Sequence, residues 1–122
     1  GRRLKVYVDS VGKRSIGIGR NLDDVGISAE EANFLLDNDI ARAVGELNRA
    51  LPWWVTLDKT RRRALLNMMF NVGASRLLGF TQALAALQAG DYAKAADEFL
   101  DSRWADQVGD RAIRIANMIR GT

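Results

Sequence analysis

The sequence of 122 residues predicts an α+β fold, in which a small N-terminal β-hairpin lobe is joined by a long helix to a helical C-terminal lobe. Near the N-terminus, apolar residues recur with a period of two, as in a half-buried strand. A capping signature then opens a long segment of helical periodicity, and the segments that follow are all of helical type. We expect a single domain over residues 1–122, large enough to bury a core.

Residues 1–27 form the predicted β lobe. The period-two positions lie on both sides of a turn within residues 4–19, at Leu4, Val6, Val8, Ile16 and Ile18. The turn falls at Ser10–Lys13, where Gly12 tolerates a positive φ. Glycines at positions 17 and 19 weaken a strand and leave room for a ligand near the backbone, although a bulged strand explains them equally well. We expect residues 21–27 to form an irregular loop.

Residues 28–50 form the predicted bridging helix. Ser28 followed by Glu31 is a capping box. An apolar stripe follows at helical spacing and consists of Leu36, Ile40, Val44 and Leu47. Pro52, the only proline, marks the end of the helix. Some 22 residues would span about 33 Å, a length that suits a helix joining two lobes.

Residues 51–122 form the predicted helical lobe. Asp58 caps a first helix that ends at Gly73, and a second helix runs from about Thr81 to Ala89. Asp91 caps a third helix that ends near Ser102, and a last helix covers about residues 110–120. We interpret the three tryptophans, at positions 53, 54 and 104, as packing residues of this lobe in preference to sugar-stacking residues.

The composition restricts the chemistry. The chain has no histidine and no cysteine, which excludes imidazole bases, thiol nucleophiles, disulfides and the usual zinc sites. Acid–base work then falls to carboxylates. The net charge is +3, with the excess of basic residues in residues 59–122, which favours an anionic partner. There is no uninterrupted apolar run of 18 residues and no signal peptide in this chain.

A resemblance to a known family rests on the hairpin and on four later blocks. In the hairpin, Asp9 precedes Ser15 by five intervening residues, and Ser15 opens the segment Ile16–Gly19. The later blocks are Arg62–Gly73, Gly79–Leu84, Ser102–Trp104 and Asp110–Ala112. In this order the chain resembles the phage-type lysozymes, the bacteriophage muramidases and endolysins. The resemblance implies a lysozyme-like fold and cleavage of the β-1,4 bond between N-acetylmuramic acid and N-acetylglucosamine in peptidoglycan.

The family pattern is a Glu, eight residues, an Asp, five residues and a Thr or Cys. Asp9 and Ser15 match the second spacing, so the resemblance implies catalytic roles for both. The general-acid Glu is expected immediately before Gly1, and we expect the chain to be truncated at both ends. A competing interpretation of Asp9 is turn chemistry, which is usual for an Asp at the end of a strand.

The resemblance also implies a set of substrate-binding residues: Gly19, Arg20, Asn21, Phe70, Asn71, Arg103 and Arg111. Phe70 is equally well interpreted as a core residue, and Arg103 and Arg111 as surface charges. Arg111 is the expected partner of the general acid. Arg20 stands where the family commonly has His, and we expect it to pair with Asp39 on the bridging helix. The cleft is expected between the hairpin and the helical lobe.

Further expectations concern partners. We expect no cofactor and no metal, peptidoglycan glycan strands as the partner, no nucleic acid, no membrane insertion and a monomer. The protein would be made in the cytoplasm of the host bacterium and act on the cell wall in the periplasm. One alternative is a peptidoglycan-binding, catalytically inactive lysozyme-like protein. A weaker alternative is a nucleic-acid-binding protein that uses the run at residues 61–63, because no recognisable binding motif accompanies this run.

Overall fold

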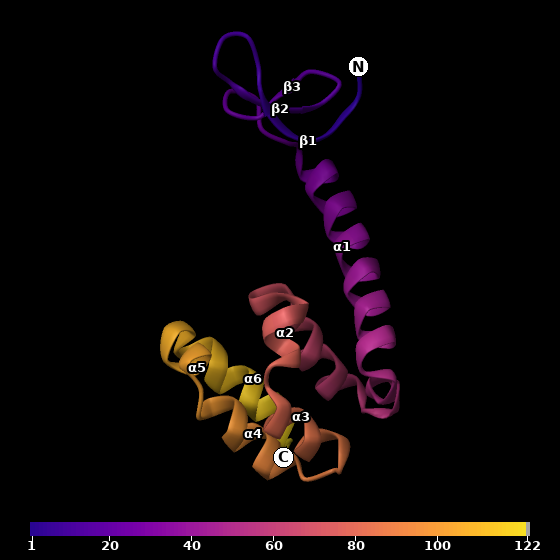
Figure 1. Ribbon diagram of the computed structural model, residues 1–122, viewed down its shortest axis with the longest axis vertical. Helices are drawn as coiled ribbons and strands as arrows, with labels where there is room; N and C mark the ends of the chain where they lie inside the picture. Colours follow the sequence, from indigo (N-terminus) through magenta and orange to yellow (C-terminus); the bar gives the residue numbers. More distant parts are fainter. Residues whose placement is uncertain (122) are drawn as a thin grey trace. The chain divides into compact units, whose positions relative to one another are not determined.

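The computed structural model describes residues 1–121 and divides into two compact units, Gly1–Asp39 and Ile40–Thr122. The first unit contains a three-stranded sheet and the start of helix α1, and the second contains the rest of α1 and the other helices (Figure 1). The fold is therefore α+β with a lysozyme-like order of elements, as the sequence predicted.

The sheet is antiparallel with the order β1-β2-β3. Its strands are β1 (Arg3–Val8), β2 (Arg14–Gly17) and β3 (Arg20–Asn21). The hairpin and its turn lie where the sequence predicted them. The third strand was not predicted, because residues 21–27 were expected to be a loop. It forms because Gly17 and Gly19, with φ of 72° and 81°, let the chain reverse within two residues.

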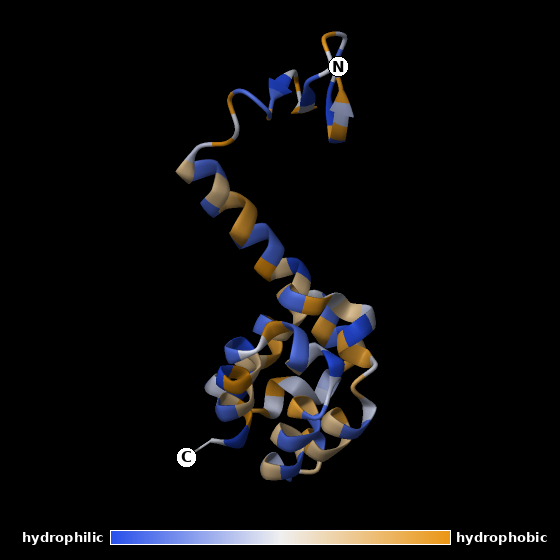
Figure 2. Cartoon of the chain, turned by 90° about the vertical axis from the view of Figure 1, so that its left-hand side faces the viewer, coloured by the Kyte–Doolittle hydropathy of each residue, from blue (hydrophilic) through white to orange (hydrophobic). Residues whose placement is uncertain are grey.

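The period-two pattern does not produce a buried sheet face. Leu4, Val6 and Val8 are all exposed, Leu4 by 82%, and Ser15 is the only buried residue of this unit. Figure 2 shows hydrophobic and hydrophilic residues side by side along this part of the chain. A sheet whose third strand has two residues offers too little area to cover the apolar side chains of its neighbours.

Helix α1 (Ala29–Ala50) has the predicted start and length, with 22 residues. The capping box is formed: the backbone N–H of Glu31 donates to Ser28 Oγ at 3.0 Å, and the N–H of Ser28 donates to Glu31 Oε1 at 2.9 Å. Only the second half of the predicted apolar stripe is covered. Leu47 is fully buried, whereas Leu36 is 49% exposed. The predicted apolar stripe is therefore present, but only its C-terminal half packs against the core.

Six elements follow α1 in the second unit: the 3-10 helix η1 (Pro52–Thr56), α2 (Lys59–Leu78), α3 (Thr81–Gln88), α4 (Tyr92–Leu100), α5 (Arg103–Val108) and α6 (Asp110–Arg120). Asp58 caps α2 by accepting from the N–H of Arg61. Gly73, with φ 80° and ψ 168°, kinks α2, and helical structure resumes beyond it. Our sequence analysis ended the helix there, because a glycine of positive φ usually terminates a helix.

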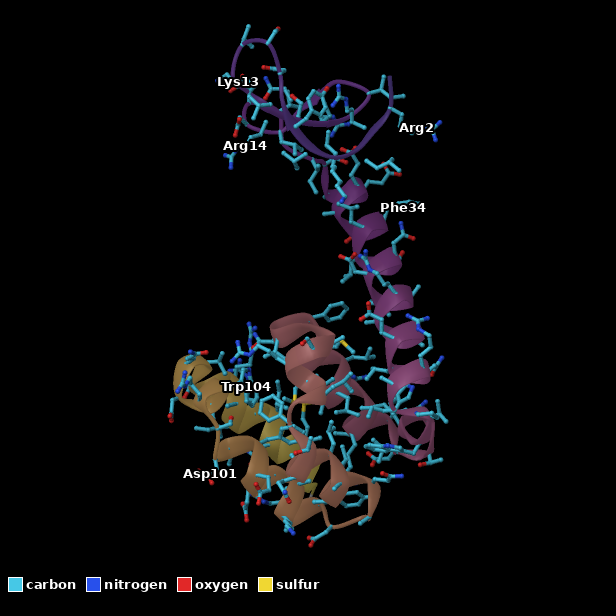
Figure 3. All side chains as sticks on the ribbon, in the orientation of Figure 1. Arg2, Lys13, Arg14, Phe34, Asp101 and Trp104 are labelled. Carbon is cyan, nitrogen blue, oxygen red and sulfur yellow. The ribbon has the colours of Figure 1, made fainter. Side chains whose placement is uncertain are left out.

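The hydrophobic core lies entirely within the second unit as far as residues 1–121 show. Its largest fully buried side chains include Trp104, Phe99, Leu65 and Met68. Phe80 packs its ring against Phe99 and Trp104, with ring centroids 5.3 and 6.1 Å apart. Figure 3 shows Trp104 among the helices of this unit. Among the described helices none is long and apolar enough to cross a membrane.

Candidate active site

Asp9 lies at the end of β1, and one of its oxygens organises the turn. Oδ1 accepts hydrogen bonds from the N–H groups of Val11 and Lys13, at 3.0 and 2.9 Å. The Asp9 backbone N–H donates to the Lys13 carbonyl at 2.9 Å. The turn chemistry considered for Asp9 is therefore present. Oδ2 has no hydrogen-bond or ion-pair partner within residues 1–121, so the carboxylate keeps one oxygen for another ligand.

Ser15 lies at the centre of the sheet. It faces Tyr7 of β1 on one side and Asn21 of β3 on the other, and it is 2% exposed. Directly opposite residues in a sheet point to the same face, and so do residues two apart on one strand. Tyr7, Ser15 and Asn21 therefore form one row across the sheet. Asp9 follows Tyr7 by two residues, directly after the end of β1.

Asn21 also has a local role in the loop that follows it. Its Nδ2 donates to Asp24 Oδ2 at 3.0 Å, and its Oδ1 accepts from the backbone N–H of Asp24 at 3.1 Å. Asp24 in turn pairs with Lys13 at 3.2 Å. This network stabilises the short connection between β3 and α1 and holds the Asn21 amide in place beside Ser15.

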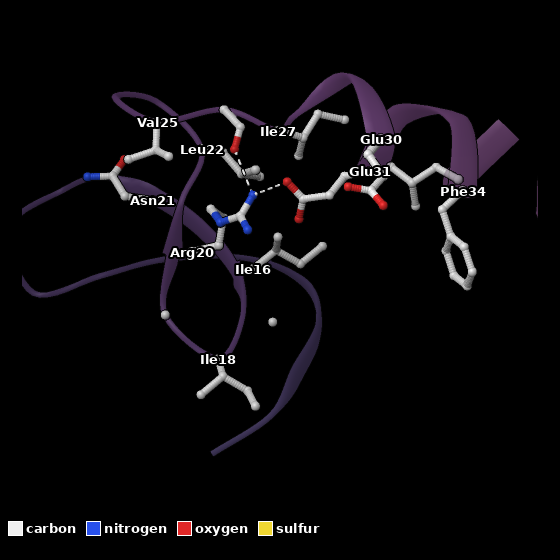
Figure 4. Close-up of a pocket in the computed structure, with 14 residues that line it drawn as sticks. Ile16, Ile18, Arg20, Asn21, Leu22, Val25, Ile27, Glu30, Glu31 and Phe34 are labelled. Carbon is white, nitrogen blue, oxygen red and sulfur yellow. Dashed lines mark hydrogen bonds and ion pairs between the residues drawn. The ribbon is translucent and has the colours of Figure 1, made fainter.

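Arg20 faces the opposite side of the sheet, because it lies directly opposite Ile16 and not Ser15. Its Nη1 donates to Glu31 Oε1 at 2.8 Å and to the Gly26 carbonyl at 3.1 Å (Figure 4). The predicted pairing with Asp39 was wrong. Glu31 is in the first turn of α1, next to the sheet, whereas Asp39 lies eight residues further on, about 12 Å along the helix axis.

The charge of Glu31 is stabilised by these contacts. The hydrogen bond from Arg20 is the main cause that lowers the pKa of Glu31 from 4.5 to about 2, and the backbone N–H of Ser28 adds to it. The same carboxylate thus closes the capping box and holds the sheet to the start of the helix. Arg20 thus has a structural partner within the unit, and its role in substrate binding stays a prediction.

An open apolar pocket of about 1200 Å³ surrounds this ion pair within the first unit. Its walls come from the β2–β3 turn, including Gly19, from the loop before α1, and from the first turns of α1 (Figure 4). Arg20 and Glu31 supply its charged groups, and Phe34 lies at its edge. The exposed apolar side chains of the unit are therefore partly gathered around one depression.

A second pocket, of about 440 Å³, lies between α2 and α6 in the second unit. The structure brings three predicted site residues together in its wall, namely Phe70, Asn71 and Arg111. Phe70 is 49% exposed, so it is a pocket residue and not a core residue. Arg111 has no carboxylate partner within residues 1–121. This pocket offers an unpaired cation, an aromatic ring and an amide.

The Asn71 side chain is oriented by Trp104. The indole Nε1 of Trp104 donates to Asn71 Oδ1 at 2.6 Å. Because an indole N–H can only donate, the atom that faces it must be the amide oxygen, which leaves the Asn71 NH₂ group as a donor for another partner. Trp104 is 1% exposed, and Trp54 is also buried, which agrees with our interpretation of these two residues as packing residues. Trp53 is partly buried against the same core.

Comparison with a protein-family pattern and comparison with individual proteins lead to one family. Residues 1–118 match the phage lysozyme family. The chain belongs to the phage lysozyme family. It is 34% identical to the endolysin of Salmonella phage P22 over 82% of this chain and 72% of that protein. It is 27% identical to the probable T4-type lysozyme 2 of Dictyostelium discoideum, over 97% of this chain and 86% of that protein.

A larger relative also contains this phage lysozyme region. The chain is 31% identical to the pre-baseplate central spike protein Gp5 of Enterobacteria phage T4 over 98% of its own length, but it spans only 26% of that protein. The alignment covers 147 residues and is longer than the chain's 122, so that relative carries residues without a counterpart here.

Two polar residues of the pocket between α2 and α6 were missed by the sequence analysis, and one predicted residue, Arg103, lies outside it. Asn67 and Arg114 line the pocket beside Asn71 and Arg111. Their spacing was the available signal, because Asn67 precedes Asn71 by four residues and Arg114 follows Arg111 by three, which places each pair on one helix face. Arg103 is exposed on α5 and is not part of the pocket lining.

Proposed function

We propose that this phage lysozyme family member is an endolysin-type muramidase that hydrolyses the β-1,4 bond between N-acetylmuramic acid and N-acetylglucosamine. The observation that carries the proposal is the family match over residues 1–118, which includes the hairpin with Asp9 and Ser15. The geometry supports it, because Asp9 keeps a free carboxylate oxygen and lies two residues after Tyr7, which is directly opposite Ser15. Glycoside hydrolysis requires a pair of carboxyl groups, and Asp9 is one of them.

Asp9 and Ser15 act on the water or on the developing positive charge. Oδ1 stays in the turn and fixes the carboxylate, while Oδ2 orients a water molecule or stabilises an oxocarbenium-like transition state. The hydroxyl of Ser15 serves as donor and acceptor for the same water. Since Ser15 is 2% exposed, this role requires that substrate binding open a path between Tyr7 and Asn21.

The second carboxyl is a glutamate immediately before Gly1, at the position that the family spacing assigns to it. Arg111 and Arg114 supply two cations to the pocket between α2 and α6, and we propose that they bind anionic groups of the substrate. A guanidinium adjacent to the general acid would lower its pKa and burial would raise it, so the balance sets how much of the acid is protonated. In an inverting enzyme its carboxyl and that of Asp9 would lie about 6.5–9.5 Å apart.

The remaining residues bind the substrate. The free NH₂ donor of Asn71 suits the carbonyl oxygen of an N-acetyl group, and the half-exposed ring of Phe70 suits the apolar face of a sugar. Asn21, directly opposite Ser15, and Gly19, in the wall of the first pocket, are the proposed contacts of the first unit. We propose that Arg103 binds the anionic peptide stems of the substrate. We propose that the protein acts as a monomer on the cell wall, after synthesis in the host cytoplasm.

An Asp9→Asn substitution tests the activity with the turn kept intact, because the amide oxygen of asparagine still accepts from Val11 and Lys13. In the full-length protein we expect loss of most release of reducing ends from purified peptidoglycan with an unchanged melting temperature. Asp37→Asn, on the exposed surface of α1, is the matched control and should retain activity. Near-normal hydrolysis by the Asp9 variant would remove Asp9 from the mechanism.

The same assay separates the alternative function. An inactive peptidoglycan-binding protein would co-sediment with peptidoglycan and release no reducing ends, even as the wild type. Sequencing the gene upstream of Gly1 provides an independent check, because any residue other than glutamate at the preceding position favours the binding function.

A further inference from the structure

The unpaired cations of the first unit are the starting point. Six basic side chains lie in residues 1–39, and three of them have ionic partners: Lys13 with Asp24, Arg14 with Asp23, and Arg20 with Glu31. The other three are Arg2, Arg3 and Lys5, none of which has a carboxylate partner within the described residues. An exposed, unpaired cation beside a site is available to an anionic ligand.

Arg3 differs from the other two because it is held against an aromatic ring. Its Cζ lies 4.9 Å from the ring centroid of Tyr7, within the range of a cation–π contact. The contact orients a side chain that would otherwise sample many rotamers. Arg3 is exposed and Tyr7 is half-buried, so both the guanidinium and part of the ring can be reached from solvent.

Tyr7 places this pair next to the proposed catalytic row. It lies directly opposite Ser15 in the β1–β2 pairing, and side chains opposite one another on one sheet face are close neighbours, with Cβ atoms about 4.5–5.5 Å apart. Asp9 follows Tyr7 by two residues. A sugar unit bound beside Asp9 and Ser15 would therefore border the Tyr7 ring and the Arg3 guanidinium that lies over it.

We propose that Arg3 and Tyr7 form a subsite that selects a sugar carrying a carboxylate next to the scissile bond, and this inference rests on the muramidase function proposed above. The ring packs on the sugar, and the guanidinium pairs with the carboxylate. In peptidoglycan that carboxylate is carried through the lactyl ether of N-acetylmuramic acid, either as the free lactyl group or as part of the peptide stem. A glycan of N-acetylglucosamine alone lacks it.

The test measures binding of soluble glycans to the full-length protein in the Asp9→Asn background, which prevents cutting. Three ligands of equal length are compared: intact peptidoglycan strands, strands stripped of peptides by an amidase so that only the lactyl carboxylate remains, and an N-acetylglucosamine oligomer. Arg3→Gln should weaken binding of the carboxylate-bearing strands roughly two- to fivefold, as expected for an exposed ion pair, and leave the uncharged oligomer unaffected. If Arg3→Gln weakens binding of only one of the two charged strands, that strand identifies whether the carboxylate belongs to the lactyl group or to the peptide stem.

Lys5→Gln is the matched control, because it removes the same charge from the same exposed strand without a ring contact. Tyr7→Phe should bind as the wild type, whereas Tyr7→Leu should weaken all three glycans. Added salt should weaken the wild type more than Arg3→Gln. Equal losses in Arg3→Gln and Lys5→Gln, or an equal loss of Arg3→Gln on charged and uncharged glycans, would overturn the subsite.

Failure of this inference is distinguishable from failure of the proposed function. If the unmodified protein binds the charged strands through Arg3 but releases no reducing ends, hydrolysis fails and the subsite stands. If it hydrolyses peptidoglycan and Arg3→Gln leaves every dissociation constant unchanged, the subsite fails and the muramidase stands. A protein that binds none of the three glycans refutes both.

Discussion

The guanidinium of Arg61 lies over the ring of Tyr92, with Cζ 3.5 Å from the ring centroid, and at the same time closes the end of α6. Its Nε donates to the Ile119 carbonyl at 2.6 Å and its Nη2 to the Arg120 carbonyl at 3.0 Å. The last carbonyls of a helix have no partner within the helix, so Arg61 satisfies groups that would otherwise be left to water. One side chain thus joins the start of α2 to the start of α4 and to the last turn of α6.

We predict that Arg61→Met destabilises the protein by about 2–3 kcal/mol, because it removes hydrogen bonds to two carbonyls and the cation–π contact. Chemical denaturation monitored by circular dichroism measures the change. Arg63→Met, an exposed neighbour in the same helix turn, is the control and should stay within about 0.5 kcal/mol of the wild type. A comparable loss of stability in both variants would contradict this role of Arg61.

The ion pair between Arg20 and Glu31 predicts a pH dependence of the first unit. The pKa of Glu31 is lowered in the folded state to about 2, so the contribution of this carboxylate to stability is complete above its ordinary pKa of 4.5 and is lost as the pH falls toward about 2. Glu31→Gln keeps a residue type that can close a capping box but removes the carboxyl group that titrates. Thermal melts between pH 1.5 and 6, followed by the NMR signals of Tyr7, should show the wild type and the variant converging at the acid end. If the melting temperatures of the two proteins changed in parallel over the whole pH range, Glu31 would not contribute to the pH dependence of stability.

The hydrogen bond between Trp104 and Asn71 predicts a functional effect with little unfolding. Trp104→Phe preserves an aromatic core residue but leaves the Asn71 oxygen without its donor, which costs about 1–2 kcal/mol. The amide is then free to rotate, so we expect a raised KM for peptidoglycan with a smaller change in kcat. Trp54→Phe also loses one indole hydrogen bond, to Asn48 Oδ1 at 2.6 Å, and serves as the control. An equal KM change in that control would show that the effect is only structural.

Two leucines of α1 test the difference between the covered and exposed parts of the apolar stripe. Leu47 is fully buried and Leu36 is 49% exposed. Leu47→Ala should cost about 2–5 kcal/mol through the cavity it leaves, whereas Leu36→Ala should stay within about 0.5 kcal/mol. Denaturant midpoints at constant slope give both values. A large loss at Leu36 would mean that this side chain is covered in solution.

Local signals predicted the parts of the fold that local interactions decide. The capping box of Ser28 and Glu31, the helix stop at Pro52 and the Asp58 cap all occur where the sequence placed them, because each depends on residues within one turn. Periodicity could identify an apolar face but not whether anything covers it. Leu36 and Leu47 belong to one stripe, and only tertiary packing distinguishes them.

The candidate site was predicted to a similar extent. Phe70, Asn71 and Arg111, which the resemblance named, meet in one pocket between α2 and α6. The partner of Arg20 could not be predicted from charge alone, because several carboxylates lie on the same helix and the choice depends on the path of a short loop. The two roles of the Asp9 oxygens likewise become visible only when the turn is built.

The buried apolar side chains of the described chain all belong to the second unit, and this has a consequence for the order in which the protein opens. Opening free energies follow local burial, so the first unit should open by fluctuations that leave the helical core closed. In hydrogen–deuterium exchange, the amides of β1 to β3 should exchange far sooner than those of α2 and α6, and ligand should slow them first. Binding a glycan would then supply part of the ordering that Gly1–Asp39 does not obtain from its own interior.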